Sequence, residues 1–171
     1  MTKLTMPKID RKLIAKKTQV VADFRKIVKA ENILDHEDQT RPFETDALSA
    51  YKQKPLVVVF PENTGEVSKI LAYCNQQRIK VVPRGAGTGL SGGALPLADS
   101  VLICLTKFNK IINIDYKNRC VVAQPGVTNL SITQAVQDKG FYYAPDPSSQ
   151  IACSIGGNVA ENSGGVHSLK Y

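Results

Sequence analysis

The sequence predicts an α+β (mixed α/β) fold, because short apolar runs of strand length alternate with stretches of helical periodicity. The first alternation lies between residues 57 and 82, where an apolar run, a helical stretch and a second apolar run follow one another. More strand-like runs and a second helical stretch come before residue 137. The chain has 171 residues, of which 43% are hydrophobic, and this is enough to bury a core of its own.

The first alternation predicts a β-α-β unit. Residues 57–60 form a continuous apolar strand that ends at Pro61. Asn63 and Glu66 have the spacing of a capping box, which predicts that a helix begins there. Residues 79–82 give the strand that completes the unit. The apolar residues of the helix recur every three or four positions: Val67, Ile70, Leu71 and Cys74.

The second half of the chain predicts more strands and one helix. The strands are expected at residues 101–105, 111–114 and 119–123, which are short and mostly apolar. The helix is expected at residues 129–136, and its side chains available for burial are Leu130, Ile132, Ala135 and Val136.

The N-terminal segment is basic and amphipathic. Residues 1–30 hold nine basic and two acidic side chains and so carry the whole net charge of +7. Such a helix packs one face on the protein and exposes the other, or it docks on an acidic partner or on anionic lipid at the inner face of the cell membrane. We expect a helical segment over residues 1–45 and a separate domain over residues 46–171. The apolar stripe of the N-terminal helical segment is Val20, Val21, Phe24, Ile27 and Val28. No nucleic-acid partner is expected, because the segment has one aromatic residue and no recognised binding motif.

A glycine-rich loop follows the strand at residues 79–82 directly. Five of the eleven residues 83–93 are glycine, which leaves a row of backbone N–H groups without side chains in front of them. This composition predicts a cradle for a phosphate or pyrophosphate, and the alternative is a flexible surface turn. Arg84 adds positive charge to the cradle or pairs with a carboxylate. The candidate binding residues are Pro83, Arg84, Gly85, Ala86, Gly87, Thr88, Gly89, Leu90, Gly92 and Gly93.

The two familiar phosphate loops do not account for this segment. A Walker loop has Lys followed by Ser or Thr after its last glycine, and here Gly93 and Ala94 stand in those places. A Rossmann loop opens a helix, but Pro96 and polar residues follow the glycines here. The next acidic residue after Asp99 is Asp115, so no acid lies about twenty positions beyond the loop to hold a ribose.

Two more motifs lie downstream of the loop. Residues 145–149 read Pro-Asp-Pro-Ser-Ser, in which two prolines fix the backbone ahead of two hydroxyls. Residues 154–165 are rich in glycine and asparagine, which suits a backbone that a ligand approaches closely. Each motif alone also fits an ordinary turn. Their candidate binding residues are Pro145, Asp146, Ser148, Ser149, Gly156, Gly157, Asn158, Asn162, Gly164 and Gly165.

From about Asp46 onward, the three motifs in this order resemble the PCMH-type FAD-binding domain of the FAD-linked oxidases of the vanillyl-alcohol-oxidase type. Within that family the chain resembles the flavin subunits of bacterial glycolate oxidases and their D-lactate and D-2-hydroxyglutarate dehydrogenase relatives. The resemblance implies an FAD cofactor, a small 2-hydroxy-acid substrate, and hydride transfer from the substrate Cα to flavin N5. It also implies partner subunits and a quinone or cytochrome that receives the electrons.

Some members of this family attach FAD covalently through a histidine in the glycine loop. This loop has Thr88 and no histidine, so non-covalent FAD is expected. His167 either faces the flavin or lies on the surface, and His36 is expected in a solvated loop. No metal site is expected, because the histidines and cysteines lack ligand spacing. The four cysteines lie in apolar stretches, which predicts buried, reduced thiols and a cytoplasmic protein.

Members of this family are more than twice as long as this chain. The resemblance therefore implies that the chain holds only the N-terminal part of the FAD-binding domain, without the substrate-binding cap. No catalytic residue is assigned, because the groups that take the substrate proton come mainly from the later parts. The alternative is an inactive fragment or a non-enzymatic module that binds a flavin or nucleotide.

Overall fold

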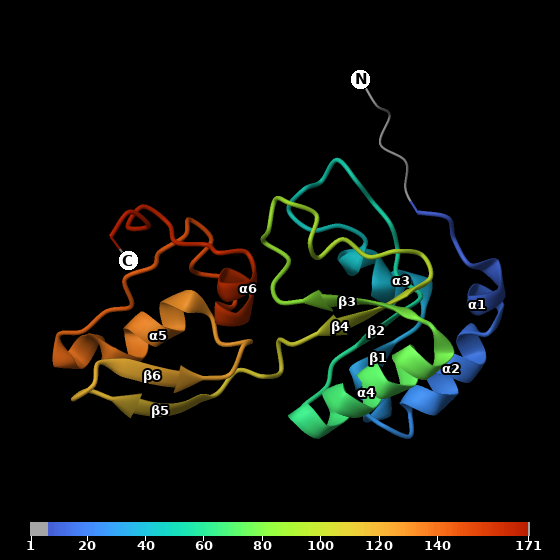
Figure 1. Cartoon of the computed structure of the whole chain (residues 1–171), viewed down its shortest axis with the longest axis horizontal. Coiled ribbons are helices and arrows are strands. Elements are labelled where there is room, and N and C mark those ends of the chain that lie inside the picture. The colour runs from blue at the N-terminus through green and yellow to red at the C-terminus, as the bar shows by residue number, and fades with distance from the viewer. Residues whose placement is uncertain (1–6, 171) are drawn as a thin grey trace. The chain divides into compact units, whose positions relative to one another are not determined.

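A computed structural model describes residues 7–170, and the chain in it forms two compact units. The first unit holds the described residues up to Thr45 together with residues 49–82 and 95–103. The second unit holds residues 46–48, 83–94 and 104–170. Both helices and strands are present, so the predicted mixed α/β fold is confirmed (Figure 1). The proposed domain boundary after residue 45 stays a prediction.

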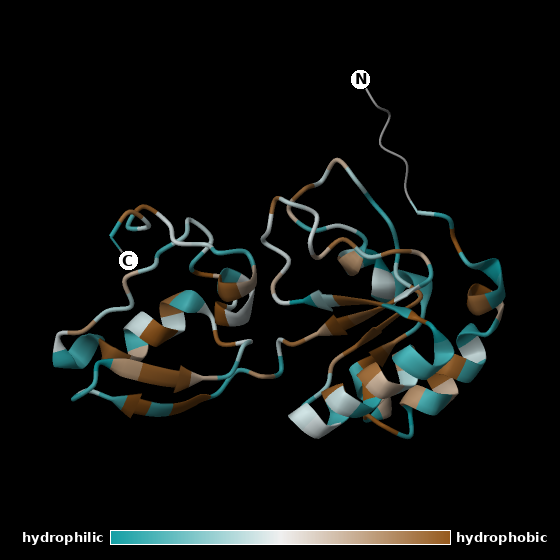
Figure 2. Cartoon of the chain, in the orientation of Figure 1, coloured by the Kyte–Doolittle hydropathy of each residue, from teal (hydrophilic) through white to brown (hydrophobic). Residues whose placement is uncertain are grey.

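The core of the first unit is a four-stranded sheet. Its strands are β1 (Ile33–Leu34), β2 (Val57–Val59), β3 (Lys80–Arg84) and β4 (Ser100–Cys104), in the order β1-β2-β4-β3. Strand β1 is antiparallel to β2, whereas β2 is parallel to β4 and pairs Val57 with Val101. All residues of β2 and β4 are buried, which explains why their sequences are almost continuously apolar (Figure 2). The last residues of β3 and β4 belong to the second unit.

Helix α4 (Thr64–Gln77) begins where its capping signal predicts. The side chain of Asn63 accepts a hydrogen bond of 2.9 Å from the N–H of Glu66. The helix buries Ile70 and Cys74 and ends at Arg78, which has a left-handed φ of 56°. Leu71 was expected on the buried stripe but is 45% exposed.

The N-terminal segment forms two short helices in place of a single long one. They are α1 (Arg11–Ala15), which is capped by Asp10, and α2 (Lys17–Phe24). Of the predicted stripe, Val20, Val21, Phe24 and Val28 are buried, and Ile27 is half-buried beyond the end of α2. The basic side chains of this segment are exposed, except Lys17, which is half-buried, so both the packing and the docking alternatives stay open. Residues 1–6 of the segment lie outside the described residues.

Packing joins α2 to α4, which lie side by side in Figure 1. The ring of Phe24 meets the ring of Tyr73 edge-on at 5.2 Å. The Tyr73 hydroxyl donates a hydrogen bond of 3.0 Å to the Asp23 carboxylate. Burial, and then this bond to an anion, raise the pKa of Tyr73 to about 12. No helix within residues 7–170 is both long and apolar enough to cross a membrane.

The second unit contains a hairpin of β5 (Ile111–Asp115) and β6 (Cys120–Ala123), followed by α5 (Asn129–Val136) and α6 (Ile155–Ala160). The β-strands and α5 agree with prediction to within one residue. Helix α6 was not predicted, because two of its six residues are glycine, the poorest helix former after proline. The short helices η1 (Ala30–Asn32), α3 (Glu37–Thr40) and η2 (Arg41–Phe43) lie within the expected helical segment 1–45, but strand β1 does not fit that expectation. The short helix η3 (Gln137–Lys139) was not predicted.

The four cysteines are all free thiols. Cys74, Cys104 and Cys153 are buried as predicted, but the prediction was wrong for Cys120, which is exposed at the start of β6. The β5–β6 sheet has only two strands, so alternate side chains of β6 face solvent. His36 is exposed ahead of α3, in agreement with the expected solvated loop.

Candidate functional site: a glycine-lined pocket in the second unit

The glycine loop leaves β3 at Arg84 and passes through residues 85–93 with no regular secondary structure. Within the described chain, no backbone N–H of these nine residues donates a hydrogen bond to another residue. The loop residues are half-buried or exposed, so water satisfies these N–H groups when no ligand is bound, and a ligand in the cavity would take the place of that water. The loop therefore offers a set of backbone donors to a bound group.

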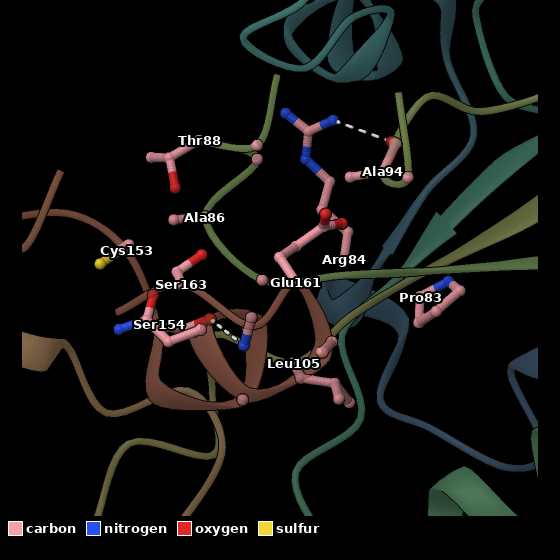
Figure 3. A pocket seen from close by; sticks show the side chains of 18 of the residues that line it. Pro83, Arg84, Ala86, Thr88, Ala94, Leu105, Cys153, Ser154, Glu161 and Ser163 are labelled. Carbon is pink, nitrogen blue, oxygen red and sulfur yellow. Dashed lines mark hydrogen bonds between the residues drawn. The ribbon is translucent and has the colours of Figure 1, made fainter. Parts of the chain in front are cut away.

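The loop forms one wall of a cavity of about 480 Å³, and residues around α6 form another (Figure 3). All of the lining residues belong to the second unit. Those that the sequence predicted are Pro83, Arg84, Gly85, Ala86, Gly87, Thr88, Gly89, Gly93, Ser149, Gly156, Gly157 and Asn158. The structure thus brings the first and third motifs together around one cavity.

Helix α6 approaches the loop and the preceding chain very closely. Ser154 caps the helix by accepting a hydrogen bond of 3.3 Å from the N–H of Gly157. A Cβ atom at Gly85 would overlap the Ser154 hydroxyl, and one at Gly156 would lie 2.6 Å from Pro125 Cβ and 3.0 Å from its carbonyl oxygen. The glycines at these two positions are what permit the approach.

Asn158 contributes an unused donor to the same cavity. The residue lines the pocket and is only 7% exposed. Its Nδ2 is buried and has no hydrogen-bond acceptor among the described residues. A buried amide without an acceptor is costly, so this group marks a place where a polar ligand atom fits.

Arg84 supplies positive charge at the start of the loop. The residue is 9% exposed, and its Nη1 donates a hydrogen bond of 3.3 Å to the carbonyl oxygen of Ala94. Burial lowers the pKa of the guanidinium, and the nearby Cys104 and Asp46 oppose that shift. An arginine stays charged at neutral pH despite such a shift, so it remains a cation at this wall of the pocket.

Eight predicted binding residues do not line the cavity: Leu90, Gly92, Pro145, Asp146, Ser148, Asn162, Gly164 and Gly165. Leu90 is 71% exposed, and Ser148 and Asn162 are also exposed. The second motif instead pairs with the end of the third. The N–H of Asp146 donates to the carbonyl oxygen of Gly164 at 3.3 Å, and the Asp146 carboxylate lies 3.0 Å from Nδ1 of His167.

The remaining lining residues were not predicted. They are Ala94, Leu105, Pro125, Cys153, Ser154, Ala160, Glu161 and Ser163. A serine at the start of a helix is a common N-cap, so the cap at Ser154 could have been predicted from the sequence if the helix had been. No motif marks Leu105 and Pro125, which reach the cavity only through tertiary packing.

The sequence matches the FAD binding domain family over residues 55–171. The chain belongs to this family. The predicted recognition and the PCMH-type fold are confirmed by this match. Among curated relatives, the chain is 52% identical over 166 residues to the glycolate oxidase subunit GlcD of Escherichia coli K12, covering 97% of this chain and 32% of the relative.

The D-lactate dehydrogenase of Anaerostipes hadrus is 37% identical over 154 residues, which are 90% of this chain and 32% of the relative. The chain therefore spans about a third of the length of the curated relatives that it matches. A solved alkyldihydroxyacetonephosphate synthase has a TM-score of 0.78 at 20% identity, covering 99% of this chain and 32% of that chain. At that identity the likeness shows the fold alone.

We predict that Gly156→Ala and Gly157→Ala will differ in stability although they are neighbours in α6. A methyl at residue 156 meets the Pro125 backbone and should cost about 1–3 kcal/mol in the free energy of unfolding. A methyl at residue 157 meets only the Ser154 hydroxyl, at 3.2 Å, and should be neutral or gain up to about 1 kcal/mol in helix propensity. Urea unfolding followed by circular dichroism measures both, and equal stabilities would contradict the close-approach argument.

Proposed function

We propose that this chain is the FAD-binding portion of a 2-hydroxy-acid oxidoreductase of the glycolate oxidase and D-lactate dehydrogenase type. The observation that carries the proposal is the pocket lined by unused backbone donors from Gly85 to Gly93. The names of the relatives support the substrate class, because they act on 2-hydroxy acids. Glycolate and D-lactate both remain candidate substrates.

The residues present fit FAD. Its pyrophosphate needs several donors and close backbone approach, and the glycine loop provides both. Its neutral portions carry acceptor atoms, one of which would satisfy the buried Nδ2 of Asn158. We assign the pyrophosphate to the amides of residues 85–89 and 93, which line the pocket, with Arg84 offsetting part of its charge.

When bound, FAD supplies the two-electron chemistry, accepting a hydride at N5 from the substrate Cα and passing the electrons to a quinone or cytochrome. The pocket residues of this chain hold and orient the cofactor. We place the groups that bind the substrate carboxylate and take its hydroxyl proton outside this chain. The remaining predicted binding residues, among them Asp146, Asn162 and Gly165, stay candidates for cofactor contacts.

We also propose a cytoplasmic location and partner subunits. The E. coli relative is named as a subunit, which supports an assembly. The exposed basic side chains in the segment of α1 and α2 are the proposed contact, either with a subunit or with the inner face of the membrane.

A second candidate is a non-enzymatic module that binds a flavin or nucleotide. The observation that favours it is that none of the residues lining the pocket is assigned to take a substrate proton. Turnover of glycolate or D-lactate by a longer protein that carries this chain separates the two candidates, because the first predicts activity there and the second predicts none.

We predict that Gly87→Val and Gly89→Val abolish saturable FAD binding. Gly87 has a φ of 72°, and a side chain there would enter the space of the Arg84 guanidinium, so the loop must change shape. Gly140→Val is the matched control, since Gly140 has a φ of 74° but faces open space outside the pocket. Isothermal titration with FAD measures the effect, and normal binding by both loop variants would refute the cradle.

We predict that acid precipitation of the FAD-loaded protein releases all of the flavin into the supernatant. The loop has Thr88 where a histidine would be needed for a covalent bond. Absorbance at the flavin bands in the supernatant and in the washed pellet gives the measurement. Yellow colour retained in the pellet would show a covalent linkage.

We predict that the 171-residue chain alone binds FAD weakly and does not oxidise glycolate or D-lactate. Losing the positioning of the substrate and the proton acceptor should cost at least about 10² to 10⁴ in rate. The assay uses excess FAD and an artificial electron acceptor, beside E. coli glycolate oxidase. Turnover within about tenfold of that enzyme would show that the catalytic groups lie in this chain.

A further inference from the structure

The glycine-lined pocket contains a carboxylate that no phosphate cradle requires. Glu161 follows α6, and its side chain reaches from the helix toward the glycine loop (Figure 3). A Cβ atom built on Gly93 would lie 2.6 Å from Glu161 Oε1, and one built on Gly89 would lie 3.8 Å from it. The carboxylate therefore rests against the side of the loop that has no side chains.

This carboxylate is not explained by a structural contact. Glu161 is exposed, and its side chain makes no hydrogen bond or ion pair with any other described residue. Among the residues that line the cavity, only Arg84 and Glu161 carry charge. Arg84 directs its Nη1 to the carbonyl oxygen of Ala94, and no ion pair within the described residues joins it to Glu161.

A negative charge at this place distinguishes one kind of phosphate from another. Each phosphate of an internal pyrophosphate, esterified on both sides, carries one negative charge. A terminal phosphate carries about 1.5 to 2 negative charges at pH 7, because its second pKa is near 6. A carboxylate close to the cradle repels the terminal phosphate more strongly.

We propose that Glu161 is a specificity-determining residue, which favours the doubly esterified pyrophosphate of a dinucleotide such as FAD over nucleotides that end in a free phosphate. This inference rests on the proposed function, since it takes the glycine loop as the pyrophosphate site. Glu161 also weakens the binding of FAD, but by less than it weakens the binding of nucleotides that end in a free phosphate. The loop amides attract every phosphate, and Glu161 sets the order of affinity among the phosphate-containing ligands.

The test compares the wild-type chain, Glu161→Gln and Asp138→Asn by isothermal titration with FAD and with ADP. Asp138 is an exposed acid of η3 outside the pocket, so Asp138→Asn makes the same change in net charge. Glu161→Gln should tighten FAD about threefold and ADP about tenfold, as expected for one and for about two unit charges at roughly 6 Å from an exposed carboxylate screened as in bulk water. Asp138→Asn should change either dissociation constant by less than about twofold.

Each outcome decides the inference. The inference is overturned if Glu161→Gln tightens both ligands equally or changes neither. It is also overturned if Glu161→Gln binds FAD more weakly, because Glu161 would then be an acceptor for a hydroxyl of the ligand. Glu161→Asp keeps the charge and should keep the preference for FAD, which separates charge from the shape of the side chain. Absence of saturable FAD binding to the wild-type chain would instead refute the proposed function and remove the basis of this inference.

Discussion

The close approach of α6 to the start of the glycine loop is the contact on which the pocket depends. Gly85 lies against Ser154, and Gly156 lies against Pro125, so a single methyl group at either position would force the two walls apart. No side chain of α6 or of the loop itself accepts a hydrogen bond from the N–H groups of the loop, so these donors stay unused within the described chain. The site is therefore built by the absence of side chains at a few positions as much as by the polar groups that surround it.

Much of the fold was predictable because the signals that form it are local. The caps of α4 and α5 come from Asn63 and Thr128, whose side chains bond to the N–H groups of Glu66 and Ser131. The buried strands β2 and β4 are almost continuously apolar, so their positions follow from composition. Helix α6 was missed since a Gly-Gly pair normally argues against a helix, and here the packing against Pro125 outweighs that preference.

The site was predictable only in part, for a related reason. The glycine loop reveals itself through composition, but Glu161 and Pro125 reach the cavity through tertiary contacts that no spacing indicates. The Pro-Asp-Pro motif was expected beside the loop, yet Asp146 pairs with Gly164 and His167. Its rigid backbone is used to hold the end of the third motif, and only Ser149 extends to the pocket.

The register of the first sheet has a consequence for how the chain folds. Strand β2 pairs in parallel with β4, which places Val57 opposite Val101. Helix α4, β3 and the glycine loop all lie within the segment that this pairing closes. Bringing such distant positions together costs loop-closure entropy before most of the stabilising contacts have formed, so this pairing forms late in folding. The pairing of β3 with β4 closes a shorter segment, and it is this pairing that brings the ends of the glycine loop together. The shape of the loop therefore depends on the nearer of the two strand pairings and not on the one between β2 and β4.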